Sequence, residues 1–361
     1  MLNKHAPRLF EMLQSSNQRV RFSTLKLLGI ALRQGLLNPN EVVPHLFALQ
    51  GELGSLEMRD LALKLLTTEG EKRPDVLRQR MCAGVKQAFE FQKKVSSTER
   101  LPSGVIATTR GSAKIYLSIF NQIFAQWIVK QRKLRESIYK SLVRLFDFET
   151  LVDDSPPNVP LLAFVAQVLA HLPYTTALDP LFIIHHATQL VILQGSQLQD
   201  QLADFLRQFG LSSQDSMEAS NTEADQLEKA ASKKFPSRTK EAHPLISPQF
   251  DIKVFSSLCQ KASVISLLLS LKTFLMKHYN LSIARCLEYD PIATERLTEK
   301  ISTKVVFRDV FDTSDVSLNE ESTNDVDNLI RHYATFRQGM RAEQCRAQTN
   351  EVEAEGEAEA E

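Results

Sequence analysis

Six basic residues lie within fifteen consecutive positions of this chain, with Glu136 as the one acidic residue among them. Such a cluster can neutralise the phosphates of a nucleic-acid backbone, giving an affinity that depends on salt and not on base sequence. It can also bind an acidic protein surface, or be an ordinary solvated face. The sequence leaves these interpretations open for Lys130, Arg132, Lys133, Arg135, Lys140 and Arg144.

Two adjacent histidines, His185 and His186, are the clearest candidates for metal binding. Neighbouring side chains on a helix point about 100° apart, so the two rings cannot ligate one metal from the same face. No HExxH spacing or nearby carboxylate supports such a site. We therefore expect one ring to pack against a neighbouring helix.

Sequence motifs typical of enzymes are missing. The chain has no G-x-x-x-x-G-K-[ST] phosphate loop and no G-x-S-x-G elbow. Its acidic residues include no clustered pair suited to general acid–base catalysis. We expect no enzymatic activity, no cofactor and no metal.

The composition is that of a globular intracellular protein. Apolar residues make up 43% of the 361 residues, enough for a large core. Basic and acidic residues number 43 each, so any basic function must be local. No apolar run reaches the roughly 18 residues of a membrane span, and no secretory signal is present. Four scattered cysteines without a CxxC pair favour free thiols in a reducing compartment: Cys82, Cys259, Cys286 and Cys345.

The basic cluster spans a turn between two predicted helices. Arg135 lies near the start of the second, where the helix dipole mildly disfavours a cation, so stability does not explain it. One apolar stripe predicts the first helix: Ile115, Ile119, Ile123 and Trp127. Another predicts the returning helix: Ile138, Leu142 and Leu145.

The N-terminal residues predict paired antiparallel helices. Caps and apolar periodicity place helices over residues 17–35, 55–70 and 74–94, and a further helix carries Pro44 in its first turn after a turn at Asn38. The period of roughly 40 residues is that of HEAT or armadillo repeats. Residues 95–112, rich in Ser, Thr and Gly, predict a surface loop.

Residues 161–198 predict two more helices and an unusual connector. Pro173 ends the first helix, Asp179 caps the second, and Gly195 ends it. The expected buried face of the second comprises Phe182, Ile183, Leu190 and Ile192.

We predict an all-α, HEAT-like helical-repeat solenoid with a disordered insert and an acidic C-terminal tail. A buried helix is expected over residues 255–278, a short one from Asp290, irregular chain over 305–318, and an amphipathic helix over 328–346. The expected boundaries are 1–210 for the repeats, 211–248 for the polar, disordered insert, 249–346 for a C-terminal helical segment, and 347–361 for the tail.

An ordered series of short motifs resembles the cohesin loaders of the Nipped-B or adherin family. It runs through RESIYKSLVRLFD (135–147), Leu-Pro-Tyr (172–174) with Thr176, Asp-Pro-Leu-Phe (179–182), His-His (185–186) and Gly-Ser (195–196). The resemblance extends loosely over residues 20–94 and 252–344, and it corresponds to the C-terminal end of the loader. Family members are several times longer, so a fragment or a reduced member is expected.

The resemblance implies the hook-like C-terminal part of a cohesin loader, located in the nucleus on chromosomes. It implies binding to double-stranded DNA, the kleisin subunit and the cohesin ATPase heads, with stimulation of ring loading and of ATP hydrolysis by the partner. The small helical-repeat partner of the loader is expected not to bind this chain, and no membrane is expected. The alternative is a generic HEAT or armadillo-type scaffold, or a transport adaptor, that binds peptides in a concave groove.

Overall fold

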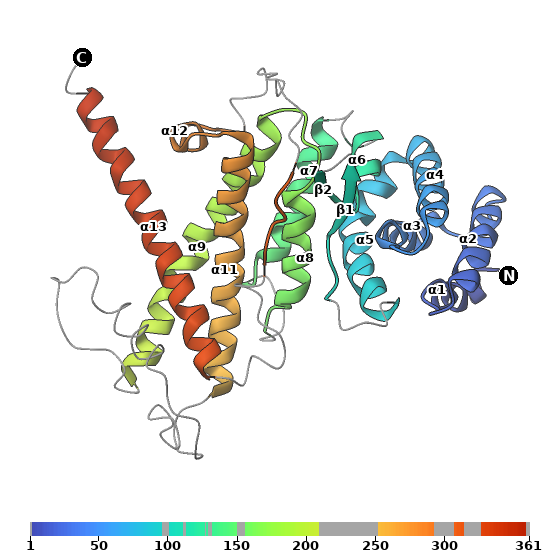
Figure 1. Ribbon diagram of the computed structural model, residues 1–361, viewed down its shortest axis with the longest axis horizontal. Coiled ribbons are helices and arrows are strands. Elements are labelled where there is room, and N and C mark those ends of the chain that lie inside the picture. Colours follow the sequence, from blue (N-terminus) through green and yellow to red (C-terminus); the bar gives the residue numbers. More distant parts are fainter. Residues whose placement is uncertain are drawn as a thin grey trace. The chain divides into compact units, whose positions relative to one another are not determined.

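A computed structural model describes the chain in nine stretches of unequal length (Figure 1). Apart from one two-stranded hairpin and irregular connections, the described residues are helical, and the predicted all-α class is confirmed with that local exception. The predicted insert, residues 211–248, lies outside the described part. The described residues are 2–95, 101–110, 113–126, 128, 132–149, 156–208, 252–291, 307–313 and 326–358.

The N-terminal helices stack as a solenoid. After a short 3₁₀ turn η1 (Leu2–His5) and α1 (Ala6–Leu13) come α2 (Gln18–Arg33), α3 (Pro39–Ala48), η2 (Leu49–Gly51), α4 (Leu56–Lys72) and α5 (Pro74–Val95). Helix α2 packs on α4 and α3 packs on α5, and the successive helices α1 and α2, α3 and α4, and α4 and α5 also contact each other. Repeat proteins are built in this way.

Local sequence signals determine where these helices begin. Asn17, Asn38 and Ser55 accept hydrogen bonds through their side chains from backbone N–H groups in the first turn that follows. Gly35, at φ +69°, ends α2 in the left-handed conformation that glycine adopts freely. The predicted turn after Asn38 is wrong, because α3 begins at Pro39 and Pro44 lies inside it.

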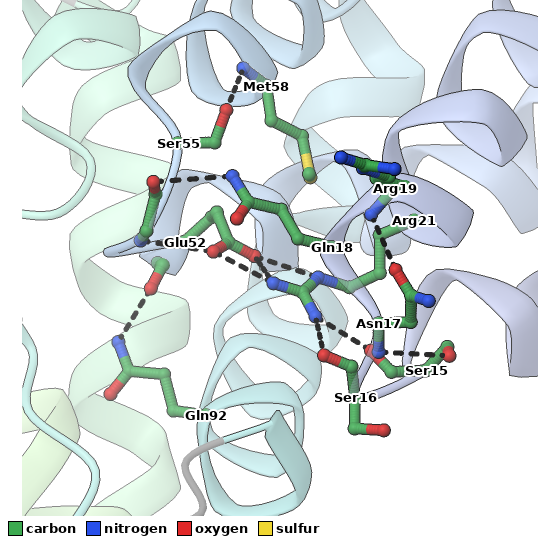
Figure 2. A network of polar contacts seen from close by, with 12 residues as sticks. Ser15, Ser16, Asn17, Gln18, Arg19, Arg21, Glu52, Ser55, Met58 and Gln92 are labelled. Atoms are coloured by element: carbon green, nitrogen blue, oxygen red, sulfur yellow. Dashed lines mark hydrogen bonds and ion pairs between the residues drawn. The ribbon is translucent and has the colours of Figure 1, made fainter.

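A buried ion pair joins α2 to the turn between η2 and α4 (Figure 2). The Nε and Nη2 of Arg21 donate to the two carboxylate oxygens of Glu52, each over 3.0 Å, and Nη1 donates to the carbonyls of Ser15 and Ser16. Glu52 also accepts from the N–H of Gly54. Every charged atom therefore has a partner within the fold, and we interpret this network as structural.

The predicted loop over residues 95–112 contains a β-strand instead. Strands β1 (Val105–Arg110) and β2 (Ala113–Ser118) form an antiparallel hairpin in which Ile106 pairs with Leu117. Ile115 therefore belongs to a strand, and the helix that follows, α6 (Asn121–Gln126), keeps only Ile123 of the predicted stripe. Over so short a segment, apolar residues four apart fit the alternation of a half-buried strand as well as the period of a helix. Trp127 lies outside the described residues.

The next helices surround the motifs that carry the family resemblance. They are α7 (Arg132–Val143) with the 3₁₀ turn η4 (Arg144–Phe146), α8 (Val159–Ala170) and α9 (Leu178–Gln208). Helix α9 does not end at Gly195 but continues to Gln208, and Met340 packs against that glycine, with its Cε 2.7 Å from where a Cβ would lie. Of the predicted buried face, Phe182 and Ile183 are buried, whereas Ile192 is 63% exposed.

The described chain divides into two compact units that cut across the boundaries expected from sequence. One comprises residues 1–147, 161–187 and 270–313, and the other comprises residues 148–160, 188–269 and 314–361. Helices α9 and α11 (Ile252–Tyr279) each contribute to both units. In the second unit, Phe205 of α9 stacks on Phe255 of α11 at 5.6 Å between ring centroids.

Helix α11 corrects the expectation that no segment could span a membrane. By length and composition it is the one described helix that qualifies. However, 61% of its most apolar window is buried inside the protein, as in the core helix of a globular domain. The predicted buried helix over residues 255–278 is thereby confirmed.

The structure of the C-terminal region agrees in part with the prediction from the sequence. A short helix, α12 (Ile283–Leu287), precedes Asp290, and the helix expected from Asp290 falls mostly outside the described residues. Helix α13 (Val326–Ala358) includes the predicted helix over 328–346 and continues into the acidic tail. The glutamates of the tail are thus part of a helical backbone up to Ala358.

Candidate nucleic-acid interface

Helix α7 and the 3₁₀ turn η4 that continues it divide the basic cluster between solvent and core. Lys133, Lys140 and Arg144 are exposed. Their spacings of seven and four residues place them on one face, one or two turns apart. None of the three makes an ion pair with any residue that the structure describes. We call Lys133, Lys140 and Arg144 the α7 stripe.

The other basic residues are placed differently. Arg132 is half-buried and its Nε donates to the Oε1 of Glu136 over 2.6 Å, an i,i+4 pair along the helix. Arg135 is only 8% exposed, and its Nε donates to the Oδ1 of Asp179 over 2.9 Å. Lys130 lies outside the described residues. The structure therefore gathers three of the six predicted site residues on a surface and places Arg135 in the interior.

Asp179 is a partner that the sequence did not reveal. We expected it to cap α9, but α9 begins at Leu178 and the Asp179 carboxylate lies in the first turn. It accepts from Arg135 and, over 2.8 Å, from the hydroxyl of Thr176. Burial raises the pKa of Asp179, and the Arg135 guanidinium opposes that rise. The buried ion pair with Asp179 stabilises Arg135 near the start of α7. The expectation that stability does not explain this cation is therefore wrong.

Aromatic rings pack against the buried side of α7. Tyr139, one turn after Arg135, packs against Tyr174 at 5.7 Å and Phe182 at 6.4 Å between ring centroids. Burial, and then the charge of Asp179, raises the pKa of the Tyr139 phenol well above its ordinary value. Tyr139 and Tyr174 therefore act as uncharged core residues. Motifs far apart in the sequence meet here, and together they pack against the buried side of α7, whereas the stripe is exposed.

The two histidines contact aromatic rings. His186 packs on Phe182 at 4.4 Å, and His185 lies 6.0 Å from Tyr289, between ring centroids. In the described part of the chain, no group of three or more His, Cys, Asp or Glu residues could hold a metal ion. The expected packing role of the pair agrees with these contacts.

Comparison with known proteins matches the first half of the chain to one family. Residues 1–190 match the Nipped-B C-terminal family model, described as "Sister chromatid cohesion C-terminus". The chain is 28% identical to the human Nipped-B-like protein over 179 residues, half of this chain and 6% of that protein. It is 23% identical to the Drosophila melanogaster Nipped-B protein over 300 residues, 82% of this chain and 13% of that one.

A solved structure shows the same fold over most of the chain. The C-terminal fragment of the Chaetomium thermophilum cohesin loader SCC2 aligns with 94% of this chain and 20% of that one, with a TM-score of 0.57 and 13% identity. This chain thus spans a small fraction of the length of each protein that it resembles.

Proposed function

Because residues 1–190 match the C-terminal model of the Nipped-B family, the chain belongs to this family of sister chromatid cohesion proteins, and we propose that it serves in loading cohesin onto DNA. The observation that carries the DNA-binding part of this proposal is the α7 stripe. Lys133, Lys140 and Arg144 are exposed together and free of acidic partners among the described residues. We propose that the chain acts in the nucleus, on chromosomes, where sister chromatids are held together.

The stripe suits a phosphate backbone. Lys133 and Arg144 are eleven residues apart in sequence, which corresponds to roughly 16 Å of helix, and one DNA strand presents about five phosphates over that length. The helix beneath it is held by the Arg135–Asp179 pair and by Tyr139, so the charges are presented on a fixed scaffold. Affinity from such contacts would be independent of base sequence, which a loader that acts along chromosomes requires.

The role in ATP hydrolysis is one of binding. We propose contacts with the kleisin subunit and the ATPase heads of cohesin, with the chemistry carried out by the heads. To stimulate hydrolysis, the chain must bind the engaged heads more tightly than the disengaged heads, because a ligand with equal affinity for both states shifts nothing. We propose no enzymatic activity for the chain itself.

The experiment is a salt titration of duplex DNA binding. Replacing Lys133, Lys140 and Arg144 together by glutamine removes three charges without disturbing the buried Arg135. The slope of log affinity against log salt should flatten by up to about 0.9 per lost contact, equally for unrelated DNA sequences. The matched control changes Lys64, Arg80 and Lys93 to glutamine, which are exposed on α4 and α5.

Two results would contradict the proposal. Equal slopes for the stripe variant and the wild-type chain would make the stripe a solvated face. DNA binding that depends on the stripe, together with no effect of the wild-type chain on cohesin ATPase, would favour the generic scaffold interpretation over loading.

A further inference from the structure

A short segment of irregular chain lies across three elements of the first unit. Residues 307–313, which we call the strap, form neither helix nor strand and contact β2, the end of α8 and the last turns of α11 (Figure 1). All of these residues belong to one compact unit. The strap thus lies on a surface formed by earlier residues of the same unit, from Tyr116 to Tyr279.

Two phenylalanines anchor the strap. Phe307 and Phe311 are 2% and 3% exposed, whereas the three residues between them, Arg308, Asp309 and Val310, face solvent. Phe274 contacts both anchors, at 6.0 Å and 5.3 Å between ring centroids. The surface beneath them, which we call the strap-binding surface, is aromatic: Tyr116, His171, Phe274, His278 and Tyr279.

The strap is also held through its main chain. The backbone N–H of Tyr116 donates to the carbonyl of Phe307 over 3.0 Å. The backbone N–H of Phe311 donates to the Nε2 of His171, also over 3.0 Å. Both bonds use backbone atoms of the strap, so they would form with any residue that has the same backbone path, proline excepted at the second position.

Main-chain hydrogen bonds combined with spaced side-chain anchors are typical of peptide recognition. We propose that the strap-binding surface is a peptide-docking site occupied in cis by the strap, and that it accepts in trans a partner segment with two aromatic side chains four residues apart. The residues between the anchors face solvent, so we expect the site to select the aromatic pair and to tolerate variation between them.

The covalently attached strap sets how tightly a partner must bind. A tethered segment competes at an effective concentration of roughly millimolar. The apparent affinity for a free peptide falls in proportion to the fraction of molecules with the surface open. A wild-type chain should therefore bind such a peptide weakly, and a chain whose strap lacks its anchors should bind it well.

The test uses a fluorescently labelled peptide with the sequence of residues 305–313. The full-length chain with Phe307→Ala and Phe311→Ala should bind this peptide at least tenfold more tightly than the wild type, and should not bind a peptide with the same two substitutions. The control variant Arg308→Ala/Val310→Ala, altered at exposed strap positions, should behave as the wild type. A folded anchor variant that does not bind the peptide would overturn the proposal.

Hydrogen exchange of the wild-type chain tests the same idea without a substitution. The Phe311 amide should exchange faster than amides in the middle of α8, such as Val168, because a docked strap opens without global unfolding. Exchange of both amides at one common rate would show that the strap is integral to the core and would sink the proposal. A wild-type dimer that becomes a monomer in the anchor variant would assign the surface to a second copy instead.

Discussion

The Nε of Arg135 lies 2.9 Å from the Oδ1 of Asp179, and the two side chains are 10% and 4% exposed. Forty-four residues separate them in the chain. The pair joins the helix that carries the α7 stripe to the first turn of α9, with Thr176 as a further donor to the same carboxylate. A buried charge of this kind is costly when its partner is removed, because the remaining charge stays desolvated.

Replacing Arg135 by alanine should lower the free energy of unfolding by roughly 3–5 kcal/mol, the usual cost of leaving a buried charge unpaired. Chemical denaturation of Arg135→Ala, Asp179→Ala and the double variant gives the coupling energy directly. The double variant should be more stable than the sum of the single losses predicts. Additive losses would contradict a buried pair.

Removing a charge from the α7 stripe should affect stability much less than removing Arg135. Lys133→Ala, at an exposed position on the same helix, should change stability by less than about 0.5 kcal/mol. It serves as the matched control for Arg135→Ala. A loss comparable to that of Arg135 would show that Lys133 is buried in solution.

Replacing Gly84 by alanine should destabilise the first unit, although alanine favours helices. A Cβ at this position would lie 2.6–2.7 Å from the Cβ, Cγ and Cδ2 of Phe47, at the contact of α3 with α5. The ring cannot move away at its base, so we expect a net loss of about 1–3 kcal/mol from overpacking. Thermal unfolding of Gly84→Ala beside Gly29→Ala, whose Cβ would meet only the end of Leu65 at 3.3 Å, provides the comparison. Equal melting temperatures would contradict the close contact.

The stability of the chain should depend on pH through His171. Burial, and then the neighbouring charge of His278, lowers the pKa of His171 from 6.5 to about 4, and a hydrogen bond with the Tyr116 backbone opposes this shift. Between pH 6.5 and pH 4 the unfolded chain therefore binds a proton that the folded chain does not. Stability should be fully present above pH 6.5 and should fall by up to about 3 kcal/mol as pH drops to 4.

The variant His171→Gln isolates this effect. Its amide oxygen can accept the Phe311 N–H that His171 accepts now, but it does not titrate. The pH slope of its unfolding free energy between pH 6.5 and pH 4 should be shallower than that of the wild type by one proton, whatever its absolute stability. His45, whose pKa is also lowered to about 4 by burial, contributes equally to both proteins and cancels.

Substitution of His185 should remove no metal. The ring is half-buried beside Tyr289, so His185→Ala should cost on the order of 1 kcal/mol. Elemental analysis of the purified wild-type chain is the deciding measurement. Stoichiometric zinc that disappears in His185→Ala would overturn the packing interpretation.

Much of the helical framework could be predicted from the sequence, because the ends of helices depend on local interactions. Asn17 and Ser55 each bond to a backbone N–H within three residues, and Pro74 begins a helix where its missing N–H costs nothing. The repeat pattern and the ordered motifs of the family depend on the same local information. The match over residues 1–190 bears out the family resemblance.

Other features depended on contacts between residues far apart in sequence. Gly195 has the local signature of a helix end, yet it lies inside α9, and its missing side chain leaves the space that Met340 occupies. Ile115 fits a helical stripe, yet it pairs across a hairpin with Thr108. In both cases tertiary packing outweighed local preference.

The basic cluster also depends partly on local sequence and partly on tertiary contacts. From the sequence its charges were equivalent, because spacing along a helix identifies a face but not the direction in which that face points. The hydrogen bond to Asp179, which lies 44 residues away in the chain, holds Arg135 inward. Lys133, Lys140 and Arg144 are thereby left in water, since an unpaired charge is stable only where solvent can reach it.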